Sequence, residues 1–268
     1  MMPRTLRPLS LGQLLDETFN IYRRNFVLFV GISAIPNIAL LLLQLVYTQL
    51  AINSAKGLGV AAVLAGLGTV FASIVVSSIV TAATTFGVSD VYLETPTSIG
   101  ACYSRVGAKA LRVFFVSFVV GLIVGVGFLL CFVPGIYWAG VYGIAIPAVV
   151  LENIGTGQAL SRSSDLTKGS VGRVIVVYFL ASFFVICLTF ALGLGIAALA
   201  SSGVGIGTRQ VLQSVIGTIS RILLGPITAI ALTLVYYDQR VRKEAFDIEH
   251  MMGLMGASGN TAPGAAAF

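Results

Sequence analysis

Four long stretches without a charged side chain constrain the fold of this chain more than any other feature. No Asp, Glu, Lys or Arg occurs in residues 25–55, 57–89, 113–151 and 174–208. A helix needs roughly 20 apolar residues to cross the hydrocarbon core of a membrane, and each stretch is longer than that. Only 10% of the residues are charged, whereas a soluble domain carries about 25%. The chain is therefore expected to be an integral membrane protein.

The apolar stretches predict helices rather than strands. Only helices and closed barrels satisfy every backbone polar group inside lipid, and barrel strands alternate apolar and polar residues. No such alternation occurs in residues 39–46 (ALLLLQLV) or 120–133 (VGLIVGVGFLLCFV). The longest stretch holds two helices, because Pro134 and Gly135 supply a turn within it. We expect an all-α, polytopic transmembrane helical bundle, with six spans near residues 26–50, 58–86, 113–133, 136–151, 174–200 and 212–237.

The basic residues predict which side of the membrane each connection faces. Thirteen of the sixteen lie in the N-terminal segment, in the connections 87–112 and 152–173, or after the last span. With six spans, these segments and both termini all fall on one side. The positive-inside rule makes that side cytoplasmic, so we expect a multi-pass membrane protein with both termini inside. Nucleic acid is not an expected partner, because the basic residues sit beside spans rather than in a soluble domain.

An amphipathic helix is predicted over residues 9–25, just before the first span. Ser10 and Gln13 have the spacing of a capping box, and the apolar residues that follow recur at helical intervals. Residues 97–115 and 155–177 carry looser versions of the pattern. These interfacial helices either touch anionic lipid head groups or a protein partner, or only anchor the spans. The candidate contacts are Arg23, Arg24, Arg105, Lys109, Arg112, Arg162, Lys168, Arg173, Arg240, Arg242 and Lys243.

Three polar residues inside apolar stretches are candidates for intramembrane function, because polar groups in lipid are costly. Asn37 and Gln44 are seven residues apart and share a face of the first span. Arg221 is a basic residue within the last apolar segment. Arg221 either lines a polar cavity, or residues 209–221 form a helix on the outer surface and the span begins later.

The rest of the chain offers no pattern typical of an active site. The acidic residues lie outside the spans or at their ends, and Cys102, Cys131 and Cys187 are scattered. The single histidine, His250, ends the one membrane domain expected over residues 1–250. After it, residues 251–268 form a Gly- and Ala-rich tail that we expect to be flexible. We expect no catalytic residue, no cofactor, no metal and no enzymatic activity.

Four segments resemble a known prokaryotic family. They are LRPLSLGQLLDETFNIYRRNF (6–26), PGIYW (134–138), IPAVVLENIGTGQALSRSSDLTKG (146–169) and YYDQRVRKEAFDIE (236–249). In this order they resemble the family named after the glycerophosphoryl diester phosphodiesterase membrane domain, over nearly all of residues 4–250. The resemblance implies a multi-helix membrane domain, found alone or fused to a phosphodiesterase. With one histidine and no polar barrel domain, this chain is not expected to carry the phosphodiesterase activity.

These observations lead to two alternative functions. The first is a non-enzymatic membrane-embedded accessory or scaffold protein that handles lipids, with the bilayer and a cytoplasmic or membrane protein as partners. The alternative is a small-molecule or lipid transporter or channel. A transporter predicts a continuous polar cavity that reaches Asn37, Gln44 or Arg221.

Overall fold

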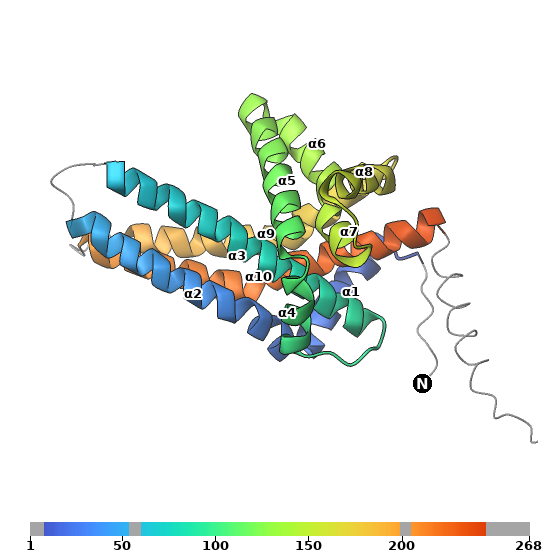
Figure 1. Ribbon diagram of the computed structural model, residues 1–268, viewed down its shortest axis with the longest axis horizontal. Helices are drawn as coiled ribbons and strands as arrows, with labels where there is room; N and C mark the ends of the chain where they lie inside the picture. The colour runs from blue at the N-terminus through green and yellow to red at the C-terminus, as the bar shows by residue number, and fades with distance from the viewer. Residues whose placement is uncertain (1–7, 54–59, 199–204, 245–268) are drawn as a thin grey trace, which may run out of the picture.

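The computed structural model describes residues 8–53, 60–198 and 205–244, which fold into α-helices joined by short turns (Figure 1). No strand occurs in these described parts of the chain, so the all-α prediction is confirmed. The helices are α1 (Leu11–Arg24), α2 (Phe26–Asn53), α3 (Val60–Tyr92), α4 (Ile99–Gly107), α5 (Ala110–Leu130), α6 (Phe132–Tyr142), α7 (Ala145–Leu151), α8 (Thr156–Thr167), α9 (Val171–Ala198) and α10 (Ile206–Glu244).

Six helical segments of the described chain are long and apolar enough to cross a membrane, which confirms the predicted polytopic bundle. They are Phe26–Thr48, Gly66–Tyr92, Ala110–Leu130, Phe132–Leu151, Val171–Gly195 and Gly207–Glu244. The fourth differs in detail from the prediction, since it is α6 followed by α7, with a break at Gly143 and Ile144. The predicted tail 251–268 and His250 lie outside the described residues.

The last helix corrects one expectation about Arg221. Helix α10 runs without interruption from Ile206 to Glu244, so residues 209–221 do not form a separate surface helix. Pro226 lies inside this helix and does not end it. Inside a bundle a proline is tolerated because neighbouring groups satisfy the backbone. The missing N–H of Pro226 frees the carbonyl of Ile222, and Tyr22 donates to the adjacent carbonyl of Leu223.

The short helices α1 and α4 begin at the capping residues that the sequence predicted. At α1 the Gln13 N–H donates to Ser10 Oγ at 3.2 Å and the Ser10 N–H donates to Gln13 Oε1 at 2.9 Å, a complete capping box. Ser98 Oγ caps α4. The segment 97–115 is interrupted between α4 and α5. Within 155–177 the helix ends near Gly169, as that glycine led us to expect, and its φ is +80°.

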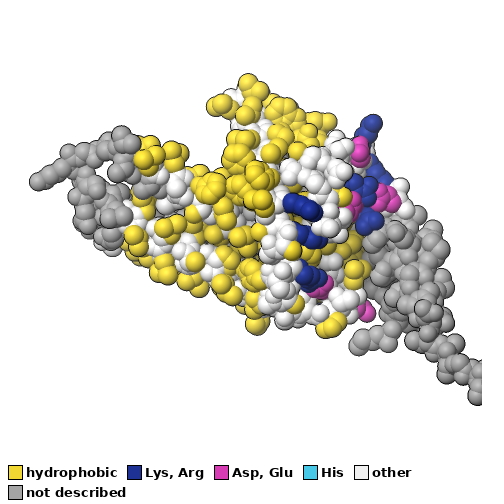
Figure 2. Space-filling view, viewed as in Figure 1, with side chains coloured by type: hydrophobic (Ala, Val, Ile, Leu, Met, Phe, Trp, Pro, Cys, Tyr) yellow, Lys and Arg dark blue, Asp and Glu magenta, His cyan; other side chains and the backbone are white. Residues whose placement is uncertain are grey.

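The four longest helices α2, α3, α9 and α10 run together along the long axis, and the α5–α6 hairpin stands away from them (Figure 1). Helices α1, α4, α7 and α8 gather around one end of this bundle, which we call the polar end. Figure 2 shows the visible Lys, Arg, Asp and Glu side chains of the described chain concentrated there. Apolar side chains cover the rest of this face, as a lipid-facing surface requires.

Helix α1 packs against α10 instead of standing apart as an isolated surface helix. Leu9, just before α1, contacts Asp238 near the end of α10, and Tyr22 contacts Leu223 further back, so the two helices are antiparallel. The face that α1 turns inward carries Leu14, Thr18 and Ile21, all buried. The polar-end helices therefore help to form the core of the molecule.

Candidate functional site

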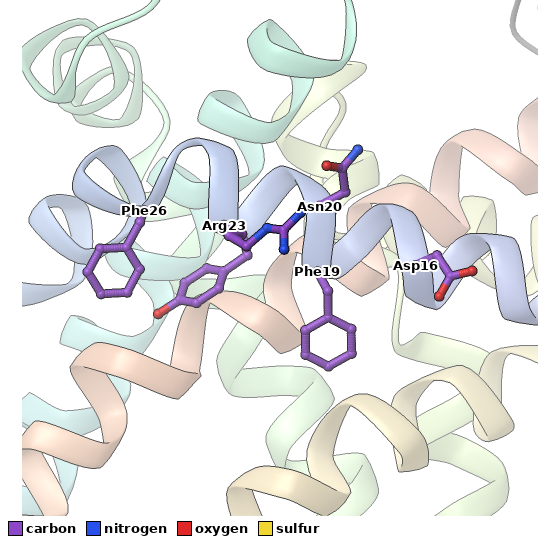
Figure 3. Close-up of a pocket in the computed structure, with 6 residues that line it drawn as sticks. Asp16, Phe19, Asn20, Arg23 and Phe26 are labelled. Atoms are coloured by element: carbon purple, nitrogen blue, oxygen red, sulfur yellow. The ribbon is translucent and has the colours of Figure 1, made fainter.

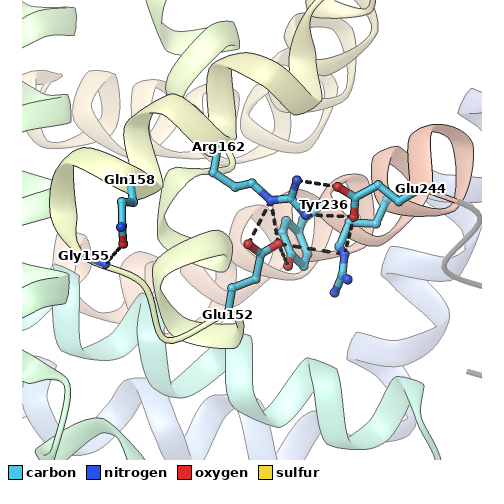
Figure 4. A network of polar contacts seen from close by, with 7 residues as sticks. Glu152, Gly155, Gln158, Arg162, Tyr236 and Glu244 are labelled. Atoms are coloured by element: carbon cyan, nitrogen blue, oxygen red, sulfur yellow. Dashed lines mark hydrogen bonds and ion pairs between the residues drawn. The ribbon is translucent and has the colours of Figure 1, made fainter. Parts of the chain in front are cut away.

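A network of charged residues joins α7, α8 and α10 at the polar end (Figure 4). Arg162 of α8 donates from Nε to both carboxylate oxygens of Glu152 at 2.9 Å, and from Nη2 to Glu244 Oε2 at 2.8 Å. Arg240 donates to the same Glu244 oxygen at 3.0 Å. The Tyr236 hydroxyl, on a fully buried side chain, donates to Glu152 Oε1 at 2.7 Å. We call these five residues the inner network.

The inner network is a charge-balanced structural unit. Its hydrogen bonds from Arg162 to Glu244 and Glu152 raise the pKa of the arginine above its ordinary value, so it stays charged. Glu152 contacts Arg162, Tyr236 and Arg240, and Glu244 contacts both arginines. Arg162 meets Glu244 through both of its Nη atoms, the bidentate geometry that an arginine and a carboxylate favour. The network unites the segments 146–169 and 236–249 that carry the family resemblance, and it fixes α8 against the end of α10.

A second set of contacts holds the start of the chain. Asp238 Oδ1 accepts a hydrogen bond from the Leu9 N–H at 2.8 Å, and the Leu9 carbonyl accepts from Arg173 and Arg242. The Asp238 carboxylate is fully buried and pairs with Arg173 at 3.1 Å and Arg242 at 3.0 Å. Both backbone groups of Leu9 are thus held by side chains from α9 and α10. We call these four residues the Leu9 clasp.

Most of the other predicted basic contacts also turn toward the protein. Arg105 pairs with Asp90, and Arg112 donates to the Asn153 side chain at 3.1 Å. Lys109 donates to the Val150 carbonyl at 2.8 Å, and burial, with Arg112 and Arg105 nearby, lowers its pKa. Lys243 Nζ donates to the backbone carbonyls of Asp165 and Lys168, both at 2.7 Å.

Three of the predicted contacts remain directed outward. Arg23, Arg24 and Lys168 are exposed, and their side chains form no hydrogen bond or ion pair with another described residue. Arg23 borders an open cavity of about 490 Å³ on one face of α1 (Figure 3). The described lining of this cavity is Asp16, Phe19, Asn20, Tyr22, Arg23 and Phe26. A basic residue between exposed aromatic rings suits the boundary between lipid and water.

The predicted intramembrane polar residues separate into two places. Asn37 is buried and its amide donates to the Ser33 carbonyl of its own helix at 2.8 Å. Gln44 and Arg221 line one cavity of about 380 Å³, together with Gln210, Gln213, Ser214 and other residues of α9 and α10. Arg221 Nη2 donates to Thr218 Oγ1 at 3.1 Å and lies 3.5 Å from Gln44 Oε1. We call this cavity the amide cleft.

The largest of the three cavities lies between the α5–α6 hairpin and the four-helix bundle, and sequence reasoning missed it. It measures about 640 Å³ and is partly open. Side-chain hydroxyls from five helices face it: Ser73, Ser77, Ser78 and Thr81 of α3, Ser117 of α5, Tyr142 of α6, Tyr178 of α9 and Thr228 of α10. We call it the hydroxyl groove. Its described lining contains no charged residue, and it shares no described residue with the amide cleft.

One hydroxyl of this groove is unpartnered. Ser117 Oγ is buried and makes no hydrogen bond within the described chain. An unsatisfied buried hydroxyl is unfavourable by about 1–3 kcal/mol, a cost that a ligand, a water, another polar side chain or a carbonyl of its own helix can relieve. A sequence signal did exist, since Ser73, Ser77 and Thr81 recur every four residues within an apolar helix.

No cluster of three or more His, Cys, Asp or Glu side chains that could hold a metal ion occurs in the described parts of the chain. Among the cysteines Cys102 is buried, while Cys131, between α5 and α6, and Cys187, on α9, are exposed. Comparisons with family models, with curated proteins and with solved structures found no match to this chain. The family resemblance of the four segments therefore stays a prediction.

Proposed function

We propose that this chain is a multi-pass protein of the prokaryotic cytoplasmic membrane that handles lipids without enzymatic chemistry, as a membrane-embedded accessory or scaffold protein. The hydroxyl groove carries the proposal. Ser73 and Ser78 donate to carbonyls of their own helix, and the row of hydroxyls along an otherwise apolar bundle can still accept hydrogen bonds from, or donate them to, a polar partner within the bilayer. The polar part of a lipid supplies such a partner at that depth.

The lining of the groove favours a neutral lipid. Its described residues offer hydroxyl donors and acceptors but no charge that would select a phosphate or an amine. Ester and hydroxyl oxygens of a glycerolipid match such a lining. A volume of about 640 Å³ lies within the range of about 300–1,000 Å³ typical of small-molecule sites. We therefore propose a diacylglycerol-like ligand.

The orientation and the family are part of the same proposal. The clustering of basic residues at the polar end supports a cytoplasmic location for that end and for both termini. Arg23, Arg24 and Lys168 are the proposed contacts with anionic head groups, because the other candidate residues are engaged within the protein. Membership of the family named after the glycerophosphoryl diester phosphodiesterase membrane domain is proposed on the four matching segments.

The single tryptophan, Trp138, gives a direct test of lipid binding. It lies on α6 next to Ala139, which lines the groove. Titration of the detergent-solubilised protein with brominated diacylglycerol should quench Trp138 fluorescence in a saturable manner. In the double variant Ser77→Leu/Ser117→Leu, apolar side chains fill the groove, and half-saturation should require at least ten times more lipid.

The matched control is Ser104→Leu, because Ser104 is an exposed residue of α4 away from the groove. This variant should bind like the wild type. Equal quenching of the groove variant and the wild type, or quenching that never saturates, would rule out a lipid site in the groove.

The transporter alternative is favoured by the amide cleft. Polar groups line this cleft within the apolar part of α2, α9 and α10, and Arg221 lies at its edge. A transport path would require the cleft to join the hydroxyl groove. A flux of polar solute through proteoliposomes that disappears in Arg221→Gln would favour transport over a lipid-handling role.

A further inference from the structure

The tip of the α5–α6 hairpin has an unusual composition for a turn between two membrane helices. Residues 118–136 contain no charged, amide or hydroxyl side chain. The turn itself has the sequence Leu129-Leu130-Cys131-Phe132-Val133. Its side chains are largely exposed, at 86% for Leu129, 71% for Leu130 and 70% for Val133. A turn that emerged into water would expose these large apolar groups, which the hydrophobic effect strongly disfavours.

The backbone of the tip is arranged for a medium without water. A single extended residue, Cys131, joins the two helices, and its N–H donates to the Gly127 carbonyl at 3.0 Å. Pro134 stands in the first turn of α6, where it has no N–H that would need a partner. A Cβ atom on Gly127 would lie 2.8 Å from the Cα of Gly135, so glycine at these positions allows the two helices to close so tightly.

The length of the returning helix limits how deep the tip can reach. The Val141 carbonyl, near the end of α6, accepts a hydrogen bond from Ser163 of α8 at 2.7 Å. Helix α8 belongs to the polar end, since its Arg162 is part of the inner network. From Val141 back to Phe132 the helix rises only about 14 Å at 1.5 Å per residue, about half of the roughly 30 Å hydrocarbon thickness. Helix α5 is longer, with 21 residues or about 30 Å along its own axis. Because α5 is inclined to the bundle (Figure 1), its rise along the bundle axis is smaller than its length.

The four helices of the bundle are, in contrast to α6, long enough to cross the whole hydrocarbon layer. Helices α2 and α9 have 28 residues each, α3 has 33 and α10 has 39. At 1.5 Å per residue each is longer than about 40 Å, enough to cross the hydrocarbon completely. The hairpin also diverges from these helices and does not run beside them to their far end (Figure 1).

We propose that α5 and α6 form a re-entrant hairpin, which enters the bilayer from the polar end and turns back within the hydrocarbon. Helices α2, α3, α9 and α10 cross the membrane, while the hairpin embeds in a single leaflet and contacts its acyl chains. Both termini keep their side, because a hairpin that returns leaves the number of crossings even. The protein then occupies more area in one leaflet than in the other, as a wedge does.

The native Cys131 at the tip allows a test without a change at the tip itself. In a Cys102→Ala/Cys187→Ala background, a membrane-impermeant maleimide should label Cys131 at less than a tenth of the level of Thr208→Cys, an exposed residue at the far end of α10. A spin label attached to Cys131 with a permeant reagent should be more accessible to oxygen than to a water-soluble nickel chelate, as at the centre of a bilayer.

Two outcomes would overturn the proposal. Labelling of Cys131 from outside at the level of Thr208→Cys would show that the hairpin crosses the membrane. Labelling only after permeabilisation, as expected for Ser104→Cys on α4, would place the tip at the polar-end surface. The proposed orientation of the protein decides only which leaflet, cytoplasmic or outer, contains the hairpin. Loss of lipid binding in the groove would leave the labelling pattern unchanged, so the two proposals fail separately.

Discussion

Helix α10 carries charged side chains near its C-terminus and, at Arg221, near its middle, and these two regions satisfy them differently. Near its C-terminus, Arg240 and Arg242 contact carboxylates of Glu244 and Asp238. Arg221 lies about 22 Å back along the helix from Tyr236 and meets only the hydroxyl of Thr218 and the amide of Gln44. The carboxylates hold the C-terminal part of α10 in one arrangement. Neutral dipoles leave the charge of Arg221 uncompensated within the described chain.

The largest expected effect comes from removing the carboxylate that holds the Leu9 clasp. Asp238→Ala leaves Arg173, Arg242 and the Leu9 N–H without their buried partner, and breaking such a buried pair costs about 3–5 kcal/mol. The free energy of unfolding, measured by titration with denaturing detergent, should fall by this amount. The control Asp165→Ala removes an exposed carboxylate and should change it by less than about 0.5 kcal/mol. Equal values would mean that Asp238 is not structurally paired.

An arginine placed at the tip of the α5–α6 hairpin would have neither a carboxylate nor an amide as a partner. Leu129→Arg should disfavour the inserted protein by about 2.5–3.5 kcal/mol, the insertion cost of arginine near the centre of a membrane helix. The matched change Thr208→Arg, beside the native Arg209, should be nearly neutral. The yield of membrane-inserted protein and its thermal unfolding in detergent report both values. A neutral Leu129→Arg would contradict a tip within the hydrocarbon.

Two neighbouring tyrosines near the C-terminus of α10 allow a hydrogen bond to a charged partner to be compared with one to a neutral partner. Tyr236 donates to the carboxylate of Glu152 at 2.7 Å, whereas the Tyr237 hydroxyl lies 2.8 Å from the hydroxyl of Ser89. Tyr236→Phe should therefore destabilise the protein by about 1.5–3 kcal/mol and Tyr237→Phe by about 0.5–1.5 kcal/mol. Detergent-unfolding titrations of the two variants compare them directly. A larger loss of unfolding free energy in Tyr237→Phe than in Tyr236→Phe would contradict a stabilising role for the Tyr236 bond to the inner network.

The smallest effect on stability is expected at Arg221. Arg221→Gln removes a partly buried charge that has no carboxylate partner in the described chain, so the free energy of unfolding should change by less than about 1 kcal/mol or rise. The same detergent titration measures it. A loss of several kcal/mol would show that the amide cleft stabilises its charge as firmly as the inner network does.

The sequence predicted the helices well because their signals are local. Uncharged stretches marked the apolar helices, and the Ser10 and Gln13 capping box marked the start of α1. The same reasoning misplaced the end of α3, which continues to Tyr92. It also missed the break at Gly143 and Ile144 within the fourth apolar segment. The apolar pattern marks where a membrane helix lies, but it does not fix the residue at which the helix ends or breaks.

The site was harder to predict, because its contacts join distant residues. Arg162 and Glu244 are 82 positions apart, and the Leu9 contacts with α10 span more than 220. Basic residues near a membrane suggested lipid contacts, yet folding places most of them against carboxylates and carbonyl oxygens. The hydroxyl groove depends on the divergence of the α5–α6 hairpin from the bundle, and that geometry leaves no trace in composition.

The Leu9 clasp has a consequence for the order in which the protein is made. The groups that hold Leu9 belong to Arg173, Asp238 and Arg242, and the last two lie in α10. During translation α1 leaves the ribosome first, but its full docking site exists only after α10 has been synthesised. Closure of the clasp is therefore a late event in biogenesis, and a chain truncated before Asp238 cannot complete it.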